Sequence, residues 1–392
     1  MLKRILYSIL LLTGLAACSN QRQEPLQALK ERVFATAAEH ARNMDARLPE
    51  RMTPRTVGPD GEPVNAGIHW WCSGFYPGSL WYIYKFGGDE GILALARKHC
   101  ARLDSLYYGH TDHDIGFQVN CSYGNGVDAN PEYEPYMLLC AEKLAGRFSP
   151  VTGVIKSWDN PKWEYPVIID NMMNLELLMV EARRHGRDDL KEVAYTHALT
   201  TIKNHFREDF STYHLVNYSP EDGSVLGKQT VQGYADSSAW ARGQAWALYG
   251  YTMMAREASL AGDSSRSEVF LAQAEAIARY LLGRLPEDGI PYWDYDAPDI
   301  SDAPRDASAG AITASALAEL SGLTGDAALA KDAREMALKQ VRTLASPEYM
   351  AEPGTNGDFL LKHGVGNLNT HSEEDAPLTY ADYYFLEALL RL

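Results

Sequence analysis

The chain has 392 residues, and 36 Lys and Arg stand against 52 Asp and Glu, which gives a formal net charge of −16 at pH 7. A charge of this sign and size excludes the basic surface that nucleic-acid-binding proteins need, so we expect no nucleic-acid partner. It would also repel an anionic ligand. The site of such a ligand must therefore contain a local positive group.

The N-terminal residues have the pattern of a bacterial lipoprotein leader. Two basic residues precede an apolar run over 5–15, and Leu15-Ala-Ala-Cys18 closes it. Small residues directly before a Cys are typical of lipidation, and the run is too short to span a membrane stably. We expect a signal peptide over 1–17, a lipid on Cys18 as the one membrane anchor, and a tether over 18–24 on the periplasmic side of the cell envelope. An ordinary signal peptide with an incidental Cys is the alternative.

Apolar spacings of three and four residues recur along the rest of the chain and predict helix after helix. No linker or low-complexity tract interrupts 25–392, so we expect one domain there. Short β-type runs occur between the helices, for example over 214–218. The predicted helices cover 25–46, 73–86, 89–106, 114–122, 131–146, 168–185, 188–207, 237–260, 267–285, 308–323, 327–345 and 376–391.

These helices suggest a closed ring. Twelve helices joined alternately by tight turns and long loops make six helical hairpins, and closing the hairpins into a ring buries every inner helix. The predicted fold is therefore all-α, an (α/α)6 barrel of six helical hairpins. No repeat of fixed length occurs, which argues against a regular solenoid. Long loops gather at one end of such a barrel, and loops on a rigid scaffold often carry function.

Two carboxylates, Asp114 and Asp170, stand at the starts of predicted helices. Apolar residues precede Asp170 in the chain, so we expect it to be buried. Burial and a nearby second carboxylate would raise its pKa, as a general acid requires. Asp is also a favoured N-cap, and capping is the alternative for both positions. His113, Asn171 and Asn174 add more polarity than a cap needs.

The segment 232–246 carries an unusual set of side chains. Its Asp-Ser-Ser at 236–238 offers N-cap chemistry for the next helix. Trp240 and Trp246 would lie roughly 120° apart around that helix and could line two sides of a hollow. Arg242 between them is suited to hold a planar carboxylate, so the segment describes a pocket for an acidic sugar. A buried helix with core Trp residues is the alternative.

Other polar residues are weaker candidates. His214 lies in a strand-like run, where a His is more often part of the core, and Trp158 is either a stacking wall or a loop anchor. Asp294, Asp296 and Asp299 form an acidic loop that lacks the distal Glu of calcium loops, so we expect it to be solvated.

The cysteines that follow the leader, Cys72, Cys100, Cys121 and Cys140, lack the paired spacing of metal sites. Disulfides are permitted by an exported location but cannot be assigned. The motifs of serine hydrolases, zincins and P-loop NTPases are absent from the sequence. We therefore expect no metal and no cofactor.

Five segments, in this order, carry a family resemblance: Trp71-Cys-Ser-Gly-Phe75 with Pro77-Gly78, His113-Asp-Ile-Gly-Phe117, Ile169-Asp-Asn-Met-Met-Asn-Leu175, Gln232 to Trp246, and Pro377 to Leu389. Together they resemble the unsaturated glucuronyl hydrolases, glycoside hydrolase family 88, over essentially the whole mature chain. The resemblance implies the (α/α)6 barrel and removal of a 4,5-unsaturated uronic acid from lyase-generated glycosaminoglycan oligosaccharides by hydration of its C4=C5 bond.

By this resemblance Asp170 is the acid/base and Asp114 its partner carboxylate. The implied lining of the unsaturated-sugar subsite is Trp71, His113, Trp158, His214, Gln232, Trp240, Arg242 and Trp246. The segment 364–371 does not reproduce the Tyr-containing loop of some family members, so linkage and sulfation preference stay open.

Two other functions remain compatible with the sequence. One is an unsaturated rhamnogalacturonyl hydrolase acting on pectin fragments, and the other is a glycan-binding lipoprotein without catalysis. The sequence carries no signal for the oligomeric state.

Overall fold

The computed structural model describes residues 23–109 and 112–392. The expected signal peptide over 1–17 and the lipidated Cys18 lie outside the described residues. Within the described part, no helix is both long and apolar enough to cross a membrane.

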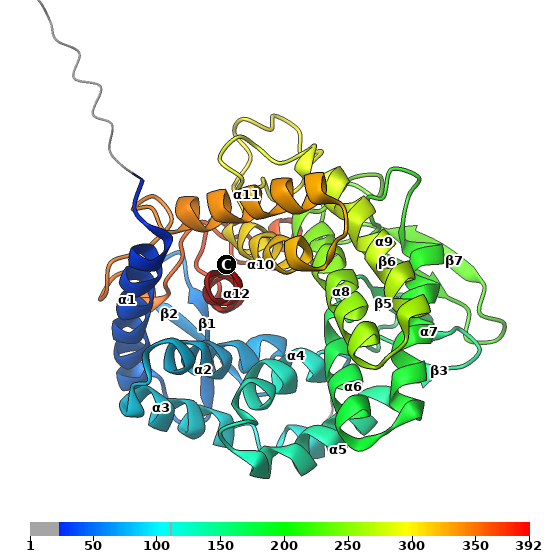
Figure 1. Cartoon of the computed structure of the whole chain (residues 1–392), viewed down its shortest axis with the longest axis horizontal. Helices are drawn as coiled ribbons and strands as arrows, with labels where there is room; N and C mark the ends of the chain where they lie inside the picture. The colour runs from blue at the N-terminus through cyan, green and yellow to red at the C-terminus, as the bar shows by residue number, and fades with distance from the viewer. Residues whose placement is uncertain (1–22, 110–111) are drawn as a thin grey trace, which may run out of the picture.

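Twelve α-helices in the described part alternate between an inner and an outer ring, which confirms the (α/α)6 barrel (Figure 1). The ring closes because α12 packs against both α10 and α2. The inner helices are α2 (Phe75–Gly87), α4 (Ile115–Val119), α6 (Asn171–His185), α8 (Ala241–Leu260), α10 (Ala307–Leu323) and α12 (Thr379–Arg391). The outer helices are α1 (Leu26–Arg47), α3 (Glu90–Ala101), α5 (Glu134–Ala145), α7 (Asp188–His205), α9 (Ser264–Leu282) and α11 (Ala327–Leu344).

Burial patterns explain which helices lie inside. Nearly every residue of α10 from Ala307 to Leu320 is buried, and most of them are Ala, Ser or Gly, which lets neighbouring helices approach closely. In α11 the buried positions form one stripe, since Leu329, Ala333, Ala337 and Val341 recur every four residues. An inner helix is thus enclosed on all sides, and an outer helix buries one face.

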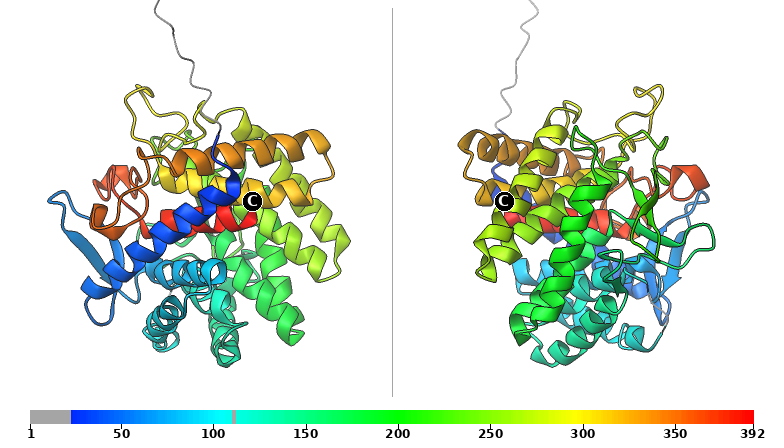
Figure 2. Two further views of the ribbon diagram at one scale, coloured as in Figure 1. Left: turned by 60° about the vertical axis from the view of Figure 1, so that its left-hand side comes forward. Right: turned by 90° about the vertical axis from the view of Figure 1, so that its right-hand side faces the viewer.

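The short strands lie in the connections that lead from an outer helix to the next inner helix. β1 (Met52–Val57) and β2 (Pro63–Gly67) form an antiparallel hairpin, β3 (Phe148–Ser149) pairs with β4 (Val154–Ile155), and β5 (Tyr165–Ile168), β6 (Leu215–Tyr218) and β7 (Val225–Gln229) form an antiparallel sheet in that order. Helical turns are η1 (Trp71–Gly74), η2 (Leu106–Tyr108), the π-helix η3 (Asn120–Gly124), η4 (Pro131–Tyr133), η5 (Asn356–Asp358) and η6 (Leu368–Thr370). Both views of Figure 2 place the β1–β2 hairpin beside the segment that carries η5 and η6.

A buried polar network ties the inner helices together inside the barrel. The Glu387 carboxylate on α12 accepts hydrogen bonds from Tyr82 Oη on α2 at 2.7 Å, Tyr249 Oη on α8 at 3.1 Å and Ser315 Oγ on α10 at 2.5 Å. Arg391, one turn further along α12, neutralises its charge at 3.5 Å. A buried carboxylate is tolerated only when it is paired and hydrogen-bonded, so this network fixes how the four helices meet.

The N-terminal ends of α4 and α6 approach each other unusually closely. A Cβ added to Gly116 on α4 would lie 2.6 Å from the Asn174 Cα on α6. The neighbouring Phe117 N–H donates to Asn174 Oδ1 at 2.6 Å. Gly at position 116 and Asn at position 174 therefore set the spacing of the two helix starts.

We expect Gly116→Ala to lower the free energy of unfolding by about 1–3 kcal/mol, because the added methyl group must push α4 away from α6. Urea unfolding followed by circular dichroism measures the change. Gly87→Ala is the matched control, since an added Cβ there meets nothing within 4 Å, and its effect should stay within about 0.5 kcal/mol. Equal stability of the two variants would contradict the close approach.

Candidate active site

A cavity of about 370 Å³ opens at the loop-bearing end of the barrel. Such a volume lies in the range of small-molecule sites. Six of the ten predicted catalytic and substrate-binding residues line it, and they come from four different parts of the chain: Trp71, Asp114, Trp158, Asp170, Gln232 and Arg242. The fold therefore brings together residues that are far apart in the sequence.

Asp114 and Asp170 lie directly before α4 and α6, at the N-cap positions. Neither side chain makes a capping hydrogen bond with its helix, so the capping alternative is wrong for both. Each side chain is largely buried, with exposed fractions of 14% and 13%, and both line the same cavity. The close contact between α4 and α6 is what places them beside one another.

Burial raises the pKa of both carboxyls. It raises the pKa of Asp170 to about 7, although the positive charge of Arg242 and a contact with the Trp246 indole favour the ionised form. Burial, together with the negative charges of Asp112 and Asp170, also raises the pKa of Asp114 well above its usual range. The repulsion between the two carboxyls thus acts on Asp114, whereas we expected it to act on Asp170. The pair retains at least one proton near neutral pH.

Two neutral histidines support the pair from behind. His214 Nε2 lies 3.6 Å from Asp170 Oδ2, and its Nδ1 accepts the Gln232 N–H at 3.3 Å, so Nε2 carries the proton. His113 Nε2 lies 3.4 Å from Asp114 Oδ1. Burial lowers the pKa of His214 to about 3 and that of His113 to about 4.

The tautomer of His214 has a consequence for Asp170. Oδ2 of Asp170 is shielded from solvent and faces an N–H, which favours leaving that oxygen without a proton. We therefore place the acidic proton of Asp170 on Oδ1, the oxygen that does not face His214. His113 and His214 are themselves 0% and 2% exposed and do not line the cavity, contrary to expectation.

Arg242 lines the cavity, but its terminal N–H groups are already used. Nη1 donates to Asp306 Oδ2 at 3.1 Å and to the Val365 carbonyl, and Nη2 donates to Gln232 Oε1 at 3.3 Å and to the Gly366 carbonyl at 2.5 Å. These four bonds leave no pair of donors for a bidentate carboxylate clamp, so that expectation is wrong in this conformation. Arg242 instead holds the 365–366 backbone against α8 and contributes its positive charge to the cavity.

Trp240 and Trp246 are buried behind the cavity wall, so the hollow expected between them is not formed. Trp240 packs on His214 with ring centroids 4.6 Å apart, and the Arg242 guanidinium lies 4.6 Å from the Trp240 ring. Trp246 packs against Phe117 at 5.2 Å. Both rings therefore support side chains of the site and do not offer a face to a ligand.

The start of α8 explains this difference. The helix begins at Ala241, four residues later than predicted, because the polar side chains before it bind elsewhere. Ser238 Oγ donates to Asp294 Oδ2 at 2.6 Å, and Asp236 Oδ1 accepts the Thr230 N–H at 2.9 Å. Asp294, which we expected to be solvated, is fully buried and pins the loop that carries Gln232.

Several lining residues were missed by sequence reasoning: Arg55, His69, Trp70, Asp112, Glu373 and Tyr380. They lie on the β1–β2 hairpin and in loops around the barrel mouth, or at the start of α12. The available signals were the loops rich in His, Trp and Asp that contain His69, Trp70 and Asp112, and the family segment that contains Tyr380. The Tyr380 ring packs against Trp71 at 4.8 Å and completes the aromatic wall.

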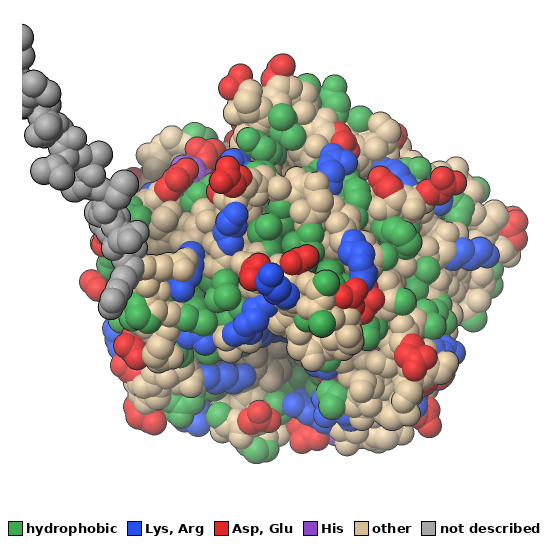
Figure 3. Space-filling view, turned by 45° about the horizontal axis from the view of Figure 1, so that its top comes forward, with side chains coloured by type: hydrophobic (Ala, Val, Ile, Leu, Met, Phe, Trp, Pro, Cys, Tyr) green, Lys and Arg blue, Asp and Glu red, His purple; other side chains and the backbone are tan. Residues whose placement is uncertain are grey.

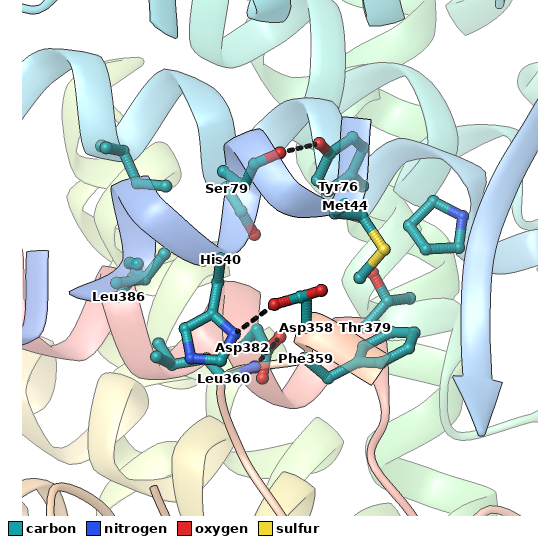
Figure 4. Close-up of a pocket in the computed structure, with 14 residues that line it drawn as sticks. His40, Met44, Tyr76, Ser79, Asp358, Phe359, Leu360, Thr379, Asp382 and Leu386 are labelled. Carbon is teal, nitrogen blue, oxygen red and sulfur yellow. Dashed lines mark hydrogen bonds and ion pairs between the residues drawn. The ribbon is translucent and has the colours of Figure 1, made fainter. Parts of the chain in front are cut away.

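A second cavity, between α1, α2 and α12, is too small for a sugar (Figure 4). Its volume of about 30 Å³ corresponds to roughly one water molecule. His40 Nδ1 there lies 3.8 Å from Asp358 Oδ1. Asp382 accepts the N–H groups of Leu360 and Leu361, both at 2.8 Å, so this region anchors the segment that leads to the larger cavity.

The described residues contain no cluster of three or more His, Cys, Asp or Glu placed to hold a metal ion. The four cysteines after the leader, Cys72, Cys100, Cys121 and Cys140, are buried and unpaired. Acidic and basic side chains are interspersed over the face shown in Figure 3.

Comparisons with known proteins agree with this geometry, although no family model matches the chain. The chain is 42% identical over 328 residues to the unsaturated glucuronyl hydrolase of Formosa agariphila, covering 82% of this chain and 79% of the relative. It is 32% identical over 364 residues to the unsaturated chondroitin disaccharide hydrolase of Streptococcus pyogenes serotype M1, covering 89% and 87%. A crystal structure of an unsaturated glucuronyl hydrolase specific for heparin superposes with a TM-score of 0.88 at 41% identity, over 93% of this chain and 96% of that one.

The raised pKa of Asp170 predicts a pH-dependent stability. Between the ordinary pKa of 3.8 and about 7, the native state holds a proton that the unfolded state releases, so stability falls as pH rises through this window. Asp170→Asn removes the ionisation, and we expect its Tm to exceed that of the wild type by roughly 2 °C more at pH 8 than at pH 5. Differential scanning calorimetry at both pH values tests this. Asp332→Asn, on an exposed face of α11, should show no such difference.

Proposed function

Because the chain belongs to the unsaturated glucuronyl hydrolases, glycoside hydrolase family 88, we propose that it removes the 4,5-unsaturated uronic acid from the non-reducing end of lyase-generated glycosaminoglycan oligosaccharides. The observation that carries the proposal is the protonated carboxyl pair, Asp114 and Asp170, at the wall of one cavity.

The first step is proton transfer to carbon. The C4=C5 bond is conjugated with the ring oxygen and forms a vinyl ether. A proton added at C4 leaves a positive charge that C5 and the ring oxygen share. Asp170 Oδ1 delivers this proton, because a pKa of about 7 leaves about half of the carboxyls protonated at neutral pH and lies close to the operating pH, as suits a general acid. His214 Nε2 lies 3.6 Å from Oδ2, so its N–H dipole favours the carboxylate that remains, without a hydrogen bond in this conformation.

The second step adds water at C5. The Asp170 carboxylate accepts a proton from the incoming water, and the new hydroxyl forms a hemiketal at C5. The hemiketal opens to a ketone at C5, which leaves a hemiacetal at C1 that releases the partner sugar. The charge balance closes, because Asp170 gives one proton to C4 and regains one from water.

The remaining residues position the sugar and tune the charge. Trp71 and Trp158 present aromatic faces to the cavity, and Gln232 offers an amide beside them. The positive charge of Arg242 favours binding of the substrate carboxylate through the electric field of the cavity, since its terminal N–H groups are occupied. Asp114 lines the same cavity, and its charge interacts with that of Asp170.

The names of the relatives indicate which sugar is linked to the unsaturated uronic acid in the proposed substrate. One is named for chondroitin disaccharides and one for heparin, so a glycosaminoglycan disaccharide is the proposed substrate. An unsaturated rhamnogalacturonyl disaccharide from pectin would undergo the same hydration, and it differs in the sugar beyond the scissile bond.

We also propose that the protein is a lipoprotein of the bacterial cell envelope, anchored through Cys18 and facing the periplasm. The support is the leader pattern, which ends in Leu15-Ala-Ala-Cys18. A substrate left by an exported lyase would meet the enzyme in that compartment.

Asp170→Asn should lower kcat by at least about a thousandfold, because the amide keeps the shape but cannot donate the proton. Loss of the ultraviolet absorbance of the conjugated double bond measures turnover of chondroitin, heparin and pectin lyase disaccharides side by side. Isothermal titration should still detect binding to the variant. A wild-type protein that binds these disaccharides without consuming them would show a glycan-binding protein instead, and turnover of the pectin product alone would favour the rhamnogalacturonyl alternative.

The anchor has its own test. In a Gram-negative host grown with a labelled fatty acid, the wild type should become labelled and Cys18→Ala should not. On the periplasmic side, the protein should resist added protease in intact cells and be digested once the outer membrane is opened. An unlabelled wild type would refute the anchor.

A further inference from the structure

Asn174 is a fully buried amide in the first turn of α6, and one half of it is unsatisfied. Its Oδ1 accepts the Phe117 N–H of α4 at 2.6 Å. Its Nδ2 is shielded from solvent and makes no hydrogen bond of ordinary geometry with any described residue. Leaving a buried donor unsatisfied costs free energy, so an N–H group retained in this position calls for a function.

The orientation of this amide is fixed by its surroundings. The Phe117 backbone N–H can only donate, so the atom that faces it is the amide oxygen, and the NH2 group must point the other way. Asp170 precedes Asn174 by four residues, which places the two side chains on the same side of α6. On that side the Asn174 N–H acts on Asp114, where it favours the ionised carboxylate and lowers its pKa.

The other ionisable groups around Asp114 act in opposite directions. They are Cys72, Asp112, His113, Arg147 and Asp170. The two carboxylates and burial raise the pKa of Asp114, and the positive charge of Arg147 lowers it. His113 is neutral because burial lowers its pKa to about 4, and Cys72 keeps its proton because burial raises its pKa.

The balance at Asp114 depends on where the proton of the pair lies. When Asp170 holds the proton, as it must before the reaction, its repulsion of Asp114 disappears. Burial and the charge of Asp112 then remain against ionisation of Asp114. The Asn174 N–H is the side-chain hydrogen-bond donor that counters them, together with the charge of Arg147.

We infer that Asn174 is a positioning residue for the proton transfer: the Phe117 N–H orients its amide, and the N–H of that amide holds Asp114 as the ionised member of the pair, so that the proton lies on Asp170. The inference rests on the proposed function, which makes Asp170 the proton donor. Asn174 does not line the cavity and acts through Asp114.

Two variants remove the donor in different ways. Asn174→Asp keeps an oxygen for the Phe117 N–H and replaces the NH2 group by a second oxygen, whereas Asn174→Ala removes both halves of the amide. Either change makes ionisation of Asp114 less favourable, so the acid limb of the pH profile of kcat/KM for an unsaturated disaccharide should move to higher pH by about one pH unit. Below that limb kcat/KM should fall about tenfold, and the loss should shrink as the pH rises.

Asn130→Ala is the matched control. The Asn130 amide is 2% exposed, donates to the Gly126 carbonyl at 3.1 Å and accepts from Arg97 Nε at 2.7 Å, and it does not line the cavity. Its loss should lower the Tm, as Asn174→Ala does, without moving the acid limb. If Asn174 only supported the fold, its variants would behave in the same way as this control.

Infrared difference spectroscopy locates the proton without turnover, because a protonated carboxyl has a C=O stretching band that a carboxylate lacks. At pH 6, Asp170→Asn should remove one such band from the wild-type spectrum. In the Asn174→Ala background the same substitution should leave the band in place, since the proton has moved to Asp114. In that background Asp114→Asn should remove it.

The outcomes separate this inference from the proposed function. A wild type that consumes no unsaturated disaccharide refutes the proposed function, and the infrared spectra still decide whether Asn174 places the proton. If the disaccharides are consumed and the acid limbs of both Asn174 variants coincide with that of the wild type, the role of Asn174 is refuted and the hydrolase function stands. Loss of the wild-type band in Asp114→Asn but not in Asp170→Asn also refutes it.

Discussion

The contact between the N-terminal ends of α4 and α6 is the constraint on which the site depends. Gly116 has no side chain, and Asn174 uses its amide oxygen to bind the Phe117 N–H. Together they bring two helix starts close enough for the carboxyls that precede them to share one cavity. An inner ring of six helices supplies many helix starts at one end of the barrel, but only a close approach of this kind turns two of them into a pair with perturbed pKa values.

The same arrangement opposes stability. Burial raises the pKa of Asp170, which means that shielding this carboxyl from water costs free energy of folding. Neutral His214 beside it offsets only part of this cost through its N–H. The buried network around Glu387, by contrast, satisfies its carboxylate with three hydroxyls and Arg391. The barrel thus holds a satisfied charge at its centre and an unsatisfied one at its mouth, which is the distribution expected when the second is retained for chemistry.

Periodicity was sufficient to predict the twelve helices, because the spacing of apolar residues is a local property of each segment. Periodicity did not predict side-chain directions that are set by partners far away in the sequence. The start of α8 depends on Asp294, 56 residues beyond Ser238, and the donors of Arg242 are taken by carbonyls 123 and 124 residues away. Arg55 and Glu373 are separated by 318 residues, and no pattern in either segment indicates that they meet. The carboxyl pair could be singled out from its position at two predicted helix starts and from the family segments; the neutral histidines beside it required the fold.

The carboxyl pair and the rim of the cavity are held by different parts of the fold, so substitutions in the two places have different effects. Asp114 and Asp170 are fixed by inner helices, whose packing tolerates few substitutions, because a single added methyl group at Gly116 would collide with α6. Arg55 and Glu373 lie on a hairpin and a loop outside the two helical rings, and loops accept new side chains more readily than a packed core does. Substitutions in the rim can therefore alter the mouth of the cavity while leaving the proton transfer intact. Substitutions at the α4–α6 contact change the carboxyl pair itself and affect every substrate alike.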